Sequence, residues 1–285
     1  MPFLSWNGNI IPQEHLNISP DNRSFRYGDG CFETIKVVNG NIILHDLHFY
    51  RLISSLVVLM ISIPDFFTKE YFTKQILQVI NANKHVNIAR VRMTLFRKGE
   101  GLKFSSVENS LQFIVQSWND EKASNTFNKI GLSIDIYKDA KKTCDVFSNL
   151  KSNNYLPYIM GKLWAESQKL DECLLTNTNG SIADATVANI FIVENGIIKT
   201  PSLSEGCVDG TMRKYLLQCF KKEKIQFEET TLTEDNLLKA SEVFLTNAIY
   251  GIKWVDVFRN KHFENKTSTI LHHTFIRHLF FLKNN

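Results

Sequence analysis

Strict alternation of apolar and polar residues marks the clearest strand in the sequence. Between positions 89 and 95 every second residue is apolar, which predicts a strand with one buried face. Residues 111–118 and 130–136 follow a similar pattern and predict two further strands. Asn-Gly pairs separate short apolar runs, and such pairs favour tight hairpin turns. Hairpins are therefore expected around Asn7-Gly8, Asn39-Gly40, Asn179-Gly180 and Asn195-Gly196.

Helical periodicity appears in several other segments. A helix is expected to begin near Asp46, which can cap it, with an apolar face of Leu47, Tyr50, Ile53 and Leu56. A second is expected from Thr68, with apolar residues at Tyr71, Ile76, Leu77 and Ile80. Further helices are predicted over residues 155–170, 209–223 and 268–282.

The order of these elements predicts the fold class. Hairpins and helices mix without a regular βαβ alternation, which favours an α+β fold of two domains over a doubly wound sheet. The polar, aperiodic run at 119–127 is the expected linker. The predicted domains are therefore residues 1–118 and residues 128–285, and the second of them contains Lys151.

Composition and charge narrow the class of protein. The chain has 285 residues, is 44% hydrophobic and carries a formal charge of +4 that is scattered along it, which argues against nucleic acid as a partner. The longest apolar stretch, 52–63, is too short to span a membrane, and the N-terminus lacks the pattern of a signal peptide. The five cysteines have no CxxC spacing, so we expect reduced thiols in a cytoplasmic protein and no metal site.

Four segments carry candidate chemistry, each with a plain structural alternative. The run YGDGCFET at 27–34 suits a backbone close to a ligand, or an ordinary turn. Arg51 in an apolar helix suits an anion, or snorkels to water. Lys151 precedes a helix, and its position alone favours a solvated surface group. The helix opened by Gly210 offers amides to a phosphate, or is simply capped by Asp209.

Together these segments resemble the fold-type IV pyridoxal-phosphate enzymes, the class IV aminotransferase family. That family includes branched-chain aminotransferases, D-amino acid aminotransferases and aminodeoxychorismate lyases. The likeness covers nearly the whole chain and rests on motifs in family order. They are YGDGCFET at 27–34, HxxRL from His48, KxxN from Lys151, ADATVANIFIVENGIIKTP at 183–201, GTMR at 210–213 and EVFLTNA at 242–248. Each is weak alone, but the ordered set is specific. The resemblance implies the two-domain D-amino acid aminotransferase-like architecture.

The resemblance also implies a role for each matching residue. Lys151 matches the lysine that holds pyridoxal 5′-phosphate as a Schiff base, and Arg51 matches the arginine that binds the cofactor phosphate. Thr211 and Met212 match the helix-start positions whose amides cradle that phosphate. Asp184 stands where the family usually has a glutamate facing the pyridine nitrogen. It is one methylene shorter, a difference in reach of about 1.5 Å.

Other implied site residues are less defined. Thr34 is expected near the cofactor, where its hydroxyl could assist proton transfer. Asn247 is expected beside the phosphate, followed by Ala248 where transaminases often have threonine. Tyr27 and Arg97 are candidates for holding the substrate, as is Lys103. Each of them could equally be a packing or surface residue.

Departures from the family pattern favour one branch. GDGCF and the Asn247-Ala248 pair resemble the lyases, which convert 4-amino-4-deoxychorismate to 4-aminobenzoate and pyruvate for folate synthesis. After Arg97 the chain has Leu102 and Phe104 in place of the Arg-x-His pair of D-amino acid enzymes. The leading interpretation is this lyase, and the alternative is an aminotransferase for branched-chain or D-amino acids. A cofactor-binding protein without catalysis is a third. The resemblance further implies a homodimer acting on a small-molecule amine.

Overall fold

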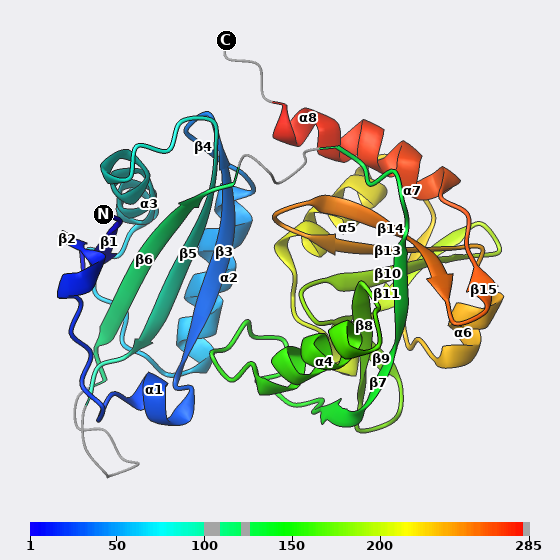
Figure 1. The fold of residues 1–285 in the computed structure, drawn as a ribbon, viewed down its shortest axis with the longest axis horizontal. Helices are drawn as coiled ribbons and strands as arrows, with labels where there is room; N and C mark the ends of the chain where they lie inside the picture. Colours follow the sequence, from blue (N-terminus) through cyan, green and yellow to red (C-terminus); the bar gives the residue numbers. More distant parts are fainter. Residues whose placement is uncertain (100–108, 121–125, 282–285) are drawn as a thin grey trace. The chain divides into compact units, whose positions relative to one another are not determined.

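The structure is a computed structural model that describes residues 1–99, 109–120 and 126–281, and the chain divides by its contacts into two units (Figure 1). The first unit contains the described residues up to 120 together with Leu150–Asn154. The second contains residues 126–149 and 155–281. The expected boundary near 119–127 overlaps residues 121–125, which lie outside the described residues. Lys151, expected in the second domain, belongs by its contacts to the first unit.

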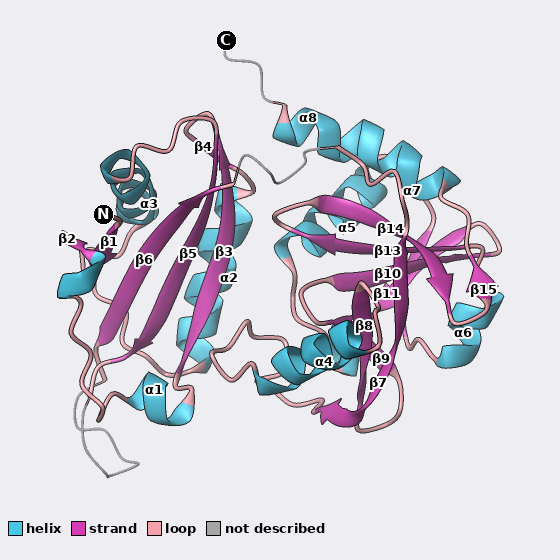
Figure 2. Cartoon of the chain, in the orientation of Figure 1, coloured by secondary structure: helices cyan, strands magenta, loops and turns pink. Residues whose placement is uncertain are grey.

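An antiparallel six-stranded sheet is the centre of the first unit (Figure 2). Its strands, in the order β2-β1-β6-β5-β3-β4, are β1 Phe3–Trp6, β2 Asn9–Pro12, β3 Gly30–Val38, β4 Asn41–Ile42, β5 Ile88–Arg97 and β6 Leu111–Asn119. Its helices are η1 Gln13–His15, α1 Arg23–Tyr27, α2 His45–Val58 and α3 Lys69–Ala82. The hairpins expected at Asn7-Gly8 and Asn39-Gly40 are confirmed, and all four turn residues have positive φ.

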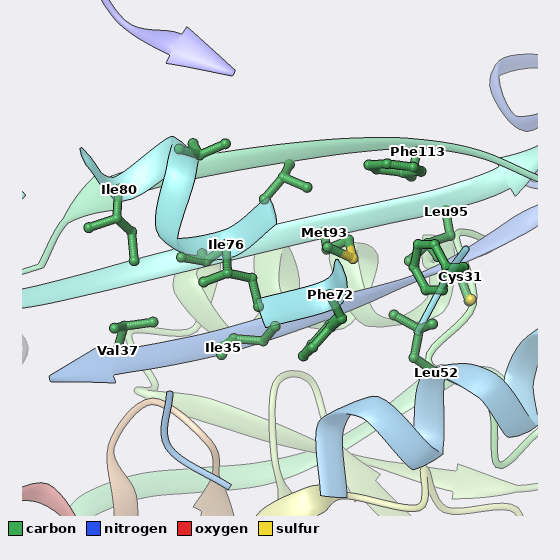
Figure 3. Packing of buried hydrophobic residues seen from close by; sticks show 14 of the residues in the cluster. Cys31, Ile35, Val37, Leu52, Phe72, Ile76, Ile80, Met93, Leu95 and Phe113 are labelled. Carbon is green, nitrogen blue, oxygen red and sulfur yellow. The ribbon is translucent and has the colours of Figure 1, made fainter. Parts of the chain in front are cut away.

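Helices α2 and α3 pack on one face of this sheet and close its core (Figure 3). The alternation in β5 is confirmed, since its apolar positions are buried against both helices. The main contributors are Ile35, Leu52, Leu56, Phe72, Ile76, Val91, Met93, Leu95 and Phe113. Each fully buried leucine or phenylalanine stabilises the fold by roughly 1.5–3 kcal/mol. The opposite face of the sheet carries the polar positions of β5.

The two helix starts differ in how well the sequence predicted them. Helix α3 starts at its N-cap residue Thr68, as expected, and the Thr68 side chain caps it by accepting a hydrogen bond from the Tyr71 amide. The cap predicted for Asp46 is wrong. Helix α2 begins after Leu44, which has a φ of 53° and makes no side-chain cap. Asp46 lies within the first turn and pairs with Lys69 Nζ at 2.7 Å instead.

The buried face of α2 also differs from the expected one. Leu56 is buried as predicted, but Tyr50 is 58% exposed and His48 is fully buried. The reason is electrostatic, because His48 and Arg51 both reach the buried carboxylate of Glu33 on β3. Apolar periodicity along a helix does not indicate which polar residues are buried in such a cluster.

A mixed nine-stranded sheet is the centre of the second unit. The strands are β7 Leu132–Lys142, β8 Glu172–Asn177, β9 Ile182–Ala185, β10 Asn189–Glu194, β11 Ile197–Pro201, β12 Phe227–Thr230, β13 Glu242–Asn247, β14 Gly251–Phe258 and β15 Lys261–His262. Their order is β12-β11-β10-β13-β14-β7-β8-β9, with β15 on β14. Strand β7 is parallel to both β8 and β14. The hairpins expected at Asn179-Gly180 and Asn195-Gly196 are confirmed.

The helices of the second unit are α4 Leu156–Ser167, η2 Leu203–Glu205, α5 Thr211–Lys222, α6 Glu234–Lys239, α7 Lys266–Leu271, η3 His272–Ile276 and α8 Arg277–Phe280. The final helix predicted over 268–282 is confirmed as helical structure from Lys266 to Phe280, which runs through α7, a π-helical stretch η3 and α8. Of the helices in the described part of the chain, none has the length and apolar content needed to cross a membrane.

Candidate active site

Backbone hydrogen bonds hold the segment that contains Lys151 against strand β3. The Phe32 amide donates to the Lys151 carbonyl at 2.9 Å, and the Asn153 amide donates to the Gly30 carbonyl at 2.9 Å. Gly30 is needed for this approach, because a Cβ there would lie 2.2 Å from the Leu95 carbonyl oxygen and 2.6 Å from the side-chain Nδ2 of Asn153. These bonds explain why Lys151 belongs to the first unit.

Two cations contact the ring of Phe32. Lys151 Nζ lies 4.5 Å from the ring centroid and the Arg92 guanidinium carbon lies 3.6 Å from it. Thr34 follows two residues after Phe32, so alternation in β3 places it on the same face, and it pairs with Arg92 in the strand register. The sequence showed Arg92 only as one polar position of an alternating strand, and it was not singled out.

The opposite face of β3 carries a buried acidic cluster. Glu33 accepts hydrogen bonds from Arg51 Nε at 2.7 Å, Arg51 NH2 at 2.5 Å and His48 Nδ1 at 2.6 Å. Burial alone would raise the pKa of Glu33, but the charge of Arg51 and the His48 contact lower it to about 2. Burial lowers the pKa of His48, so its neutral ring donates to Glu33 at pH 7. The structure thus places Arg51 in an ion pair, and Glu33 was missed from the sequence.

Replacing Glu33 with glutamine should destabilise the protein strongly. Glu33→Gln removes the charge that balances the Arg51 guanidinium, which is only 9% exposed, and breaking such a buried pair costs about 3–5 kcal/mol. The free energy of unfolding, measured by urea denaturation, should fall by that amount. The control is Glu70→Gln, at a residue in the first turn of α3, which should change it by less than about 0.5 kcal/mol.

The same pair predicts a pH dependence. The pKa of Glu33 in the folded protein is about 2, below its usual value of 4.5, so its contribution to stability is present above pH 4.5 and is lost as the pH falls toward 2. Between these values the native protein should lose stability more steeply than Glu33→Gln. Equal slopes would contradict this role for Glu33.

Arg97, a candidate for substrate binding, is held in a structural cluster. Its Nε donates to Asp29 Oδ2 at 3.0 Å, and its NH1 and NH2 donate to the carbonyls of Met60 at 3.0 Å and Leu59 at 2.6 Å. It also donates to the Asn109 side chain. These bonds tie the end of α2 to β3 and β5, and they favour a structural role for Arg97.

Tyr27, the other substrate candidate, is the last residue of α1. Its side chain is 40% exposed, and the Arg23 guanidinium lies 5.7 Å from its ring centroid. Leu102, Lys103 and Phe104 lie outside the described residues.

Asp184 on β9 presents a buried carboxylate in the second unit. It is 1% exposed. Its Oδ2 accepts hydrogen bonds from Lys142 Nζ at 2.6 Å, the Tyr158 hydroxyl at 3.0 Å and the Val208 amide at 3.0 Å. Its Oδ1 accepts one from Asn189 Nδ2 at 3.0 Å. Lys142 was missed from the sequence, because in the run KDAKK it looks like any surface lysine.

The first turn of helix α5 packs closely against Asn189 on β10. Gly210 is its N-cap residue and the helix has no side-chain cap, so the alternative interpretation of a cap by Asp209 is wrong. A Cβ at Gly210 would lie 1.8 Å from Asn189 Oδ1. Thr211 and Met212 are buried in the first turn. The amides of a helix start have no partner within the helix, and with the positive end of the helix dipole they suit a phosphate.

Asn247 shapes the turn between β13 and β14. Its Oδ1 accepts hydrogen bonds from the amides of Ile249 and Tyr250, both at 3.0 Å. Its Nδ2 donates to the Val187 carbonyl at 3.1 Å. The side chain therefore connects this turn to the segment that follows Asp184.

The described residues fit pyridoxal phosphate. The first turn of helix α5 has no side-chain cap, so its backbone amides suit a phosphate. Asp184 offers a buried anion whose Oδ1 accepts one hydrogen bond from the described residues, which leaves room for a donor such as a protonated ring nitrogen. Lys151 offers an amine on a segment fixed by backbone hydrogen bonds.

Comparisons with known proteins agree with this chemistry. The model of the amino-transferase class IV family matches residues 30–256. A Methanocaldococcus jannaschii protein assigned as a branched-chain-amino-acid aminotransferase is 29% identical over 248 residues, covering 84% of this chain and 82% of its own. The aminodeoxychorismate lyase of Vibrio harveyi is 25% identical over 245 residues, covering 86% and 88%.

Solved structures share the fold of this chain. The crystal structure of the branched-chain aminotransferase from Thermoproteus uzoniensis matches with a TM-score of 0.88 and 20% identity, over 97% of this chain and 94% of its own. The predicted α+β architecture of the fold-type IV enzymes is thereby confirmed.

Proposed function

Because the chain belongs to the class IV aminotransferase family, whose members depend on pyridoxal phosphate, we propose that it is a 4-amino-4-deoxychorismate lyase. It would release pyruvate and leave 4-aminobenzoate for folate synthesis, in the cytoplasm. The observation that carries the proposal is the pairing of GDGCF at 28–32 with Asn247-Ala248, both of which resemble the lyases. The Vibrio harveyi lyase among the relatives supports it.

Each proposed cofactor residue has a physical task. The Lys151 amine would bond covalently to the cofactor aldehyde and afterwards carry protons. Arg51, Thr211 and Met212 would bind the phosphate, and Asp184 would keep the ring nitrogen protonated. When bound, the cofactor supplies an electron sink for negative charge that develops on the substrate. The protein contributes the groups that bind, orient and protonate.

The substrate of this lyase carries carboxylates, and Arg92 on β5 is a cation that could bind one of them. Arg92 contacts the same Phe32 ring as Lys151, and guanidinium groups bind carboxylates in a defined geometry. We therefore place Arg92, ahead of Arg97, among the residues that hold the substrate. Thr34, beside Arg92 in the register, has a hydroxyl that could pass a proton to the leaving group.

The alternative is an aminotransferase for branched-chain or D-amino acids. The Methanocaldococcus jannaschii relative favours it, since it is 29% identical to this chain against 25% for the lyase. Both reactions need Lys151, so the lysine does not discriminate between them. The difference lies in whether the substrate loses a leaving group or exchanges its amine.

A product assay separates the two functions. With aminodeoxychorismate, the purified protein should form 4-aminobenzoate and pyruvate. Its kcat/KM for leucine, valine or D-alanine with a 2-oxo acid should be at least about a hundredfold lower, a gap of about 2.7 kcal/mol in transition-state binding. Robust transamination without 4-aminobenzoate would assign the aminotransferase function instead.

We also propose that the protein is a homodimer. Helix α4 supports this, because its apolar residues at helical spacing are exposed in the single chain: Leu156, Ile159, Met160 and Leu163. A stripe of this spacing lies on one helix face and suits a partner surface. Light scattering at micromolar concentration should give twice the chain mass of 32.9 kDa. A single-chain mass would contradict the proposal.

A further inference from the structure

The carboxylate assigned to the ring nitrogen is half of a buried ion pair. Lys142 Nζ lies 2.6 Å from Asp184 Oδ2, with side-chain exposures of 7% for the lysine and 2% for the aspartate. The ammonium also lies 5.1 Å from the centroid of the Tyr158 ring. A lone carboxylate would present a full negative charge to a ring nitrogen, whereas in this pair the charge of Lys142 offsets part of it.

The other groups around Asp184 leave this balance unchanged. Burial and the Asp184 charge raise the pKa of the Tyr158 hydroxyl well above its usual value, so it is a neutral donor. Burial raises the pKa of Cys207 to about 12, so this thiol is neutral as well. Two further charged groups influence the pKa of Cys207. They are Arg213 on α5 and Asp209 just before that helix.

Those two charged groups have their own partners. Asp209 pairs with Lys214 at 3.2 Å, and Arg213 pairs with Glu229 at 2.6 Å. The net charge that Asp184 presents therefore depends mainly on Lys142.

We propose that Lys142 is a positioning residue that fixes the Asp184 carboxylate and offsets its charge, so that the ring nitrogen of the bound cofactor holds its proton less firmly than beside a lone carboxylate. The inference rests on the proposed function, in which Asp184 faces that nitrogen. Its physical basis is that an opposite charge within about 4–6 Å favours the charged form of a group, and a neutralised partner favours it less. Lys142 acts through Asp184 and needs no contact with the substrate.

The test measures the protonation of the ring nitrogen itself. Protein loaded with pyridoxal phosphate that is ¹⁵N-labelled in the ring is titrated with pH and followed by ¹⁵N NMR. In Lys142→Met the midpoint should rise by about one pH unit, a roughly tenfold tighter hold on the proton. Lys142→Arg, which keeps the charge, should titrate close to the native protein. A purely structural role would lower stability without moving the midpoint.

A neighbouring lysine provides the matched control. Lys141 donates to Thr176 Oγ1 at 2.6 Å and not to Asp184, so Lys141→Met should leave the midpoint unchanged. If Lys142→Met does not fold, Lys142→Gln carries the test, because its amide can still donate to Asp184 without a charge. It should raise the midpoint as well.

The outcomes separate this inference from the proposed function. An unchanged midpoint in a folded Lys142→Met or Lys142→Gln variant, with cofactor still on Lys151, overturns the role of Lys142 and leaves the function standing. Native protein that binds no cofactor at Lys151, as judged by borohydride reduction and peptide mapping, overturns both. A raised midpoint restored by arginine supports both.

Discussion

Lys151→Met is expected to lower kcat by about 10⁴-fold or more while the protein stays folded. Methionine keeps the length of the side chain but removes the amine that bonds to the cofactor and carries protons, and proton transfer alone contributes roughly 10²–10⁴-fold. The fold should persist because the Lys151 carbonyl, which accepts from Phe32, belongs to the backbone. Pyruvate release from aminodeoxychorismate measures the loss, and circular dichroism verifies the fold.

Chemical labelling makes this result specific. Borohydride reduction of the native protein should leave a pyridoxyl group on the peptide that contains Lys151, and the Lys151→Met protein should carry none. Lys141→Met, a variant of a lysine that bonds to Thr176, should be labelled and active like the native protein. A label on any other lysine, or near-native turnover by Lys151→Met, would refute the assignment.

Local structure was largely predictable where one simple force dominates. The hairpins at Asn-Gly pairs formed because asparagine and glycine adopt positive φ at little cost, whatever surrounds them. The alternation in β5 predicted its buried face because the other positions face away from the helices. Short elements such as β12 and β15 have too few residues to show a pattern, and they were not predicted.

Polar burial explains what the sequence could not predict. Glu33 sits in an apolar strand and is buried because His48 and Arg51, far along the chain, supply its hydrogen bonds. The burial of His48 on α2 follows from the same contacts. Lys142 becomes a buried partner of Asp184 only when β7 and β9 are folded. Pairings across such distances leave no periodic signal in a single sequence.

The site residues were predicted by motif and not by physics alone. The order of the motifs singled out Lys151, Asp184 and Thr211, and the settings of these residues are compatible with the tasks proposed for them. Arg97 was a candidate for substrate binding, and its contacts with Asp29 favour a structural role. The membership of Lys151 in the first unit depends on backbone bonds to β3 that no motif encodes.

Asp184→Asn is expected to lower kcat by about 10²–10³-fold, the size measured for a preorganised electrostatic group in an active site. The amide keeps the shape of the side chain, so cofactor should still bind, but it cannot hold a proton on the ring nitrogen by charge. The ring then accepts negative charge from the substrate less readily, and every later step slows. Steady-state release of pyruvate and the ¹⁵N signal of the ring nitrogen measure the two effects separately.

Asp209→Asn is the matched control for this change. Asp209 lies at the approach to α5 and pairs with Lys214 at 3.2 Å, so it shares the region and the residue type but not the buried contacts of Asp184. It should change kcat by less than about fivefold, since exposed ion pairs contribute at most about 1 kcal/mol. Native turnover by Asp184→Asn would show that another group serves the ring nitrogen. In that case Lys142, now without its carboxylate partner, would be the first residue to test, because its ammonium could donate directly to an unprotonated nitrogen.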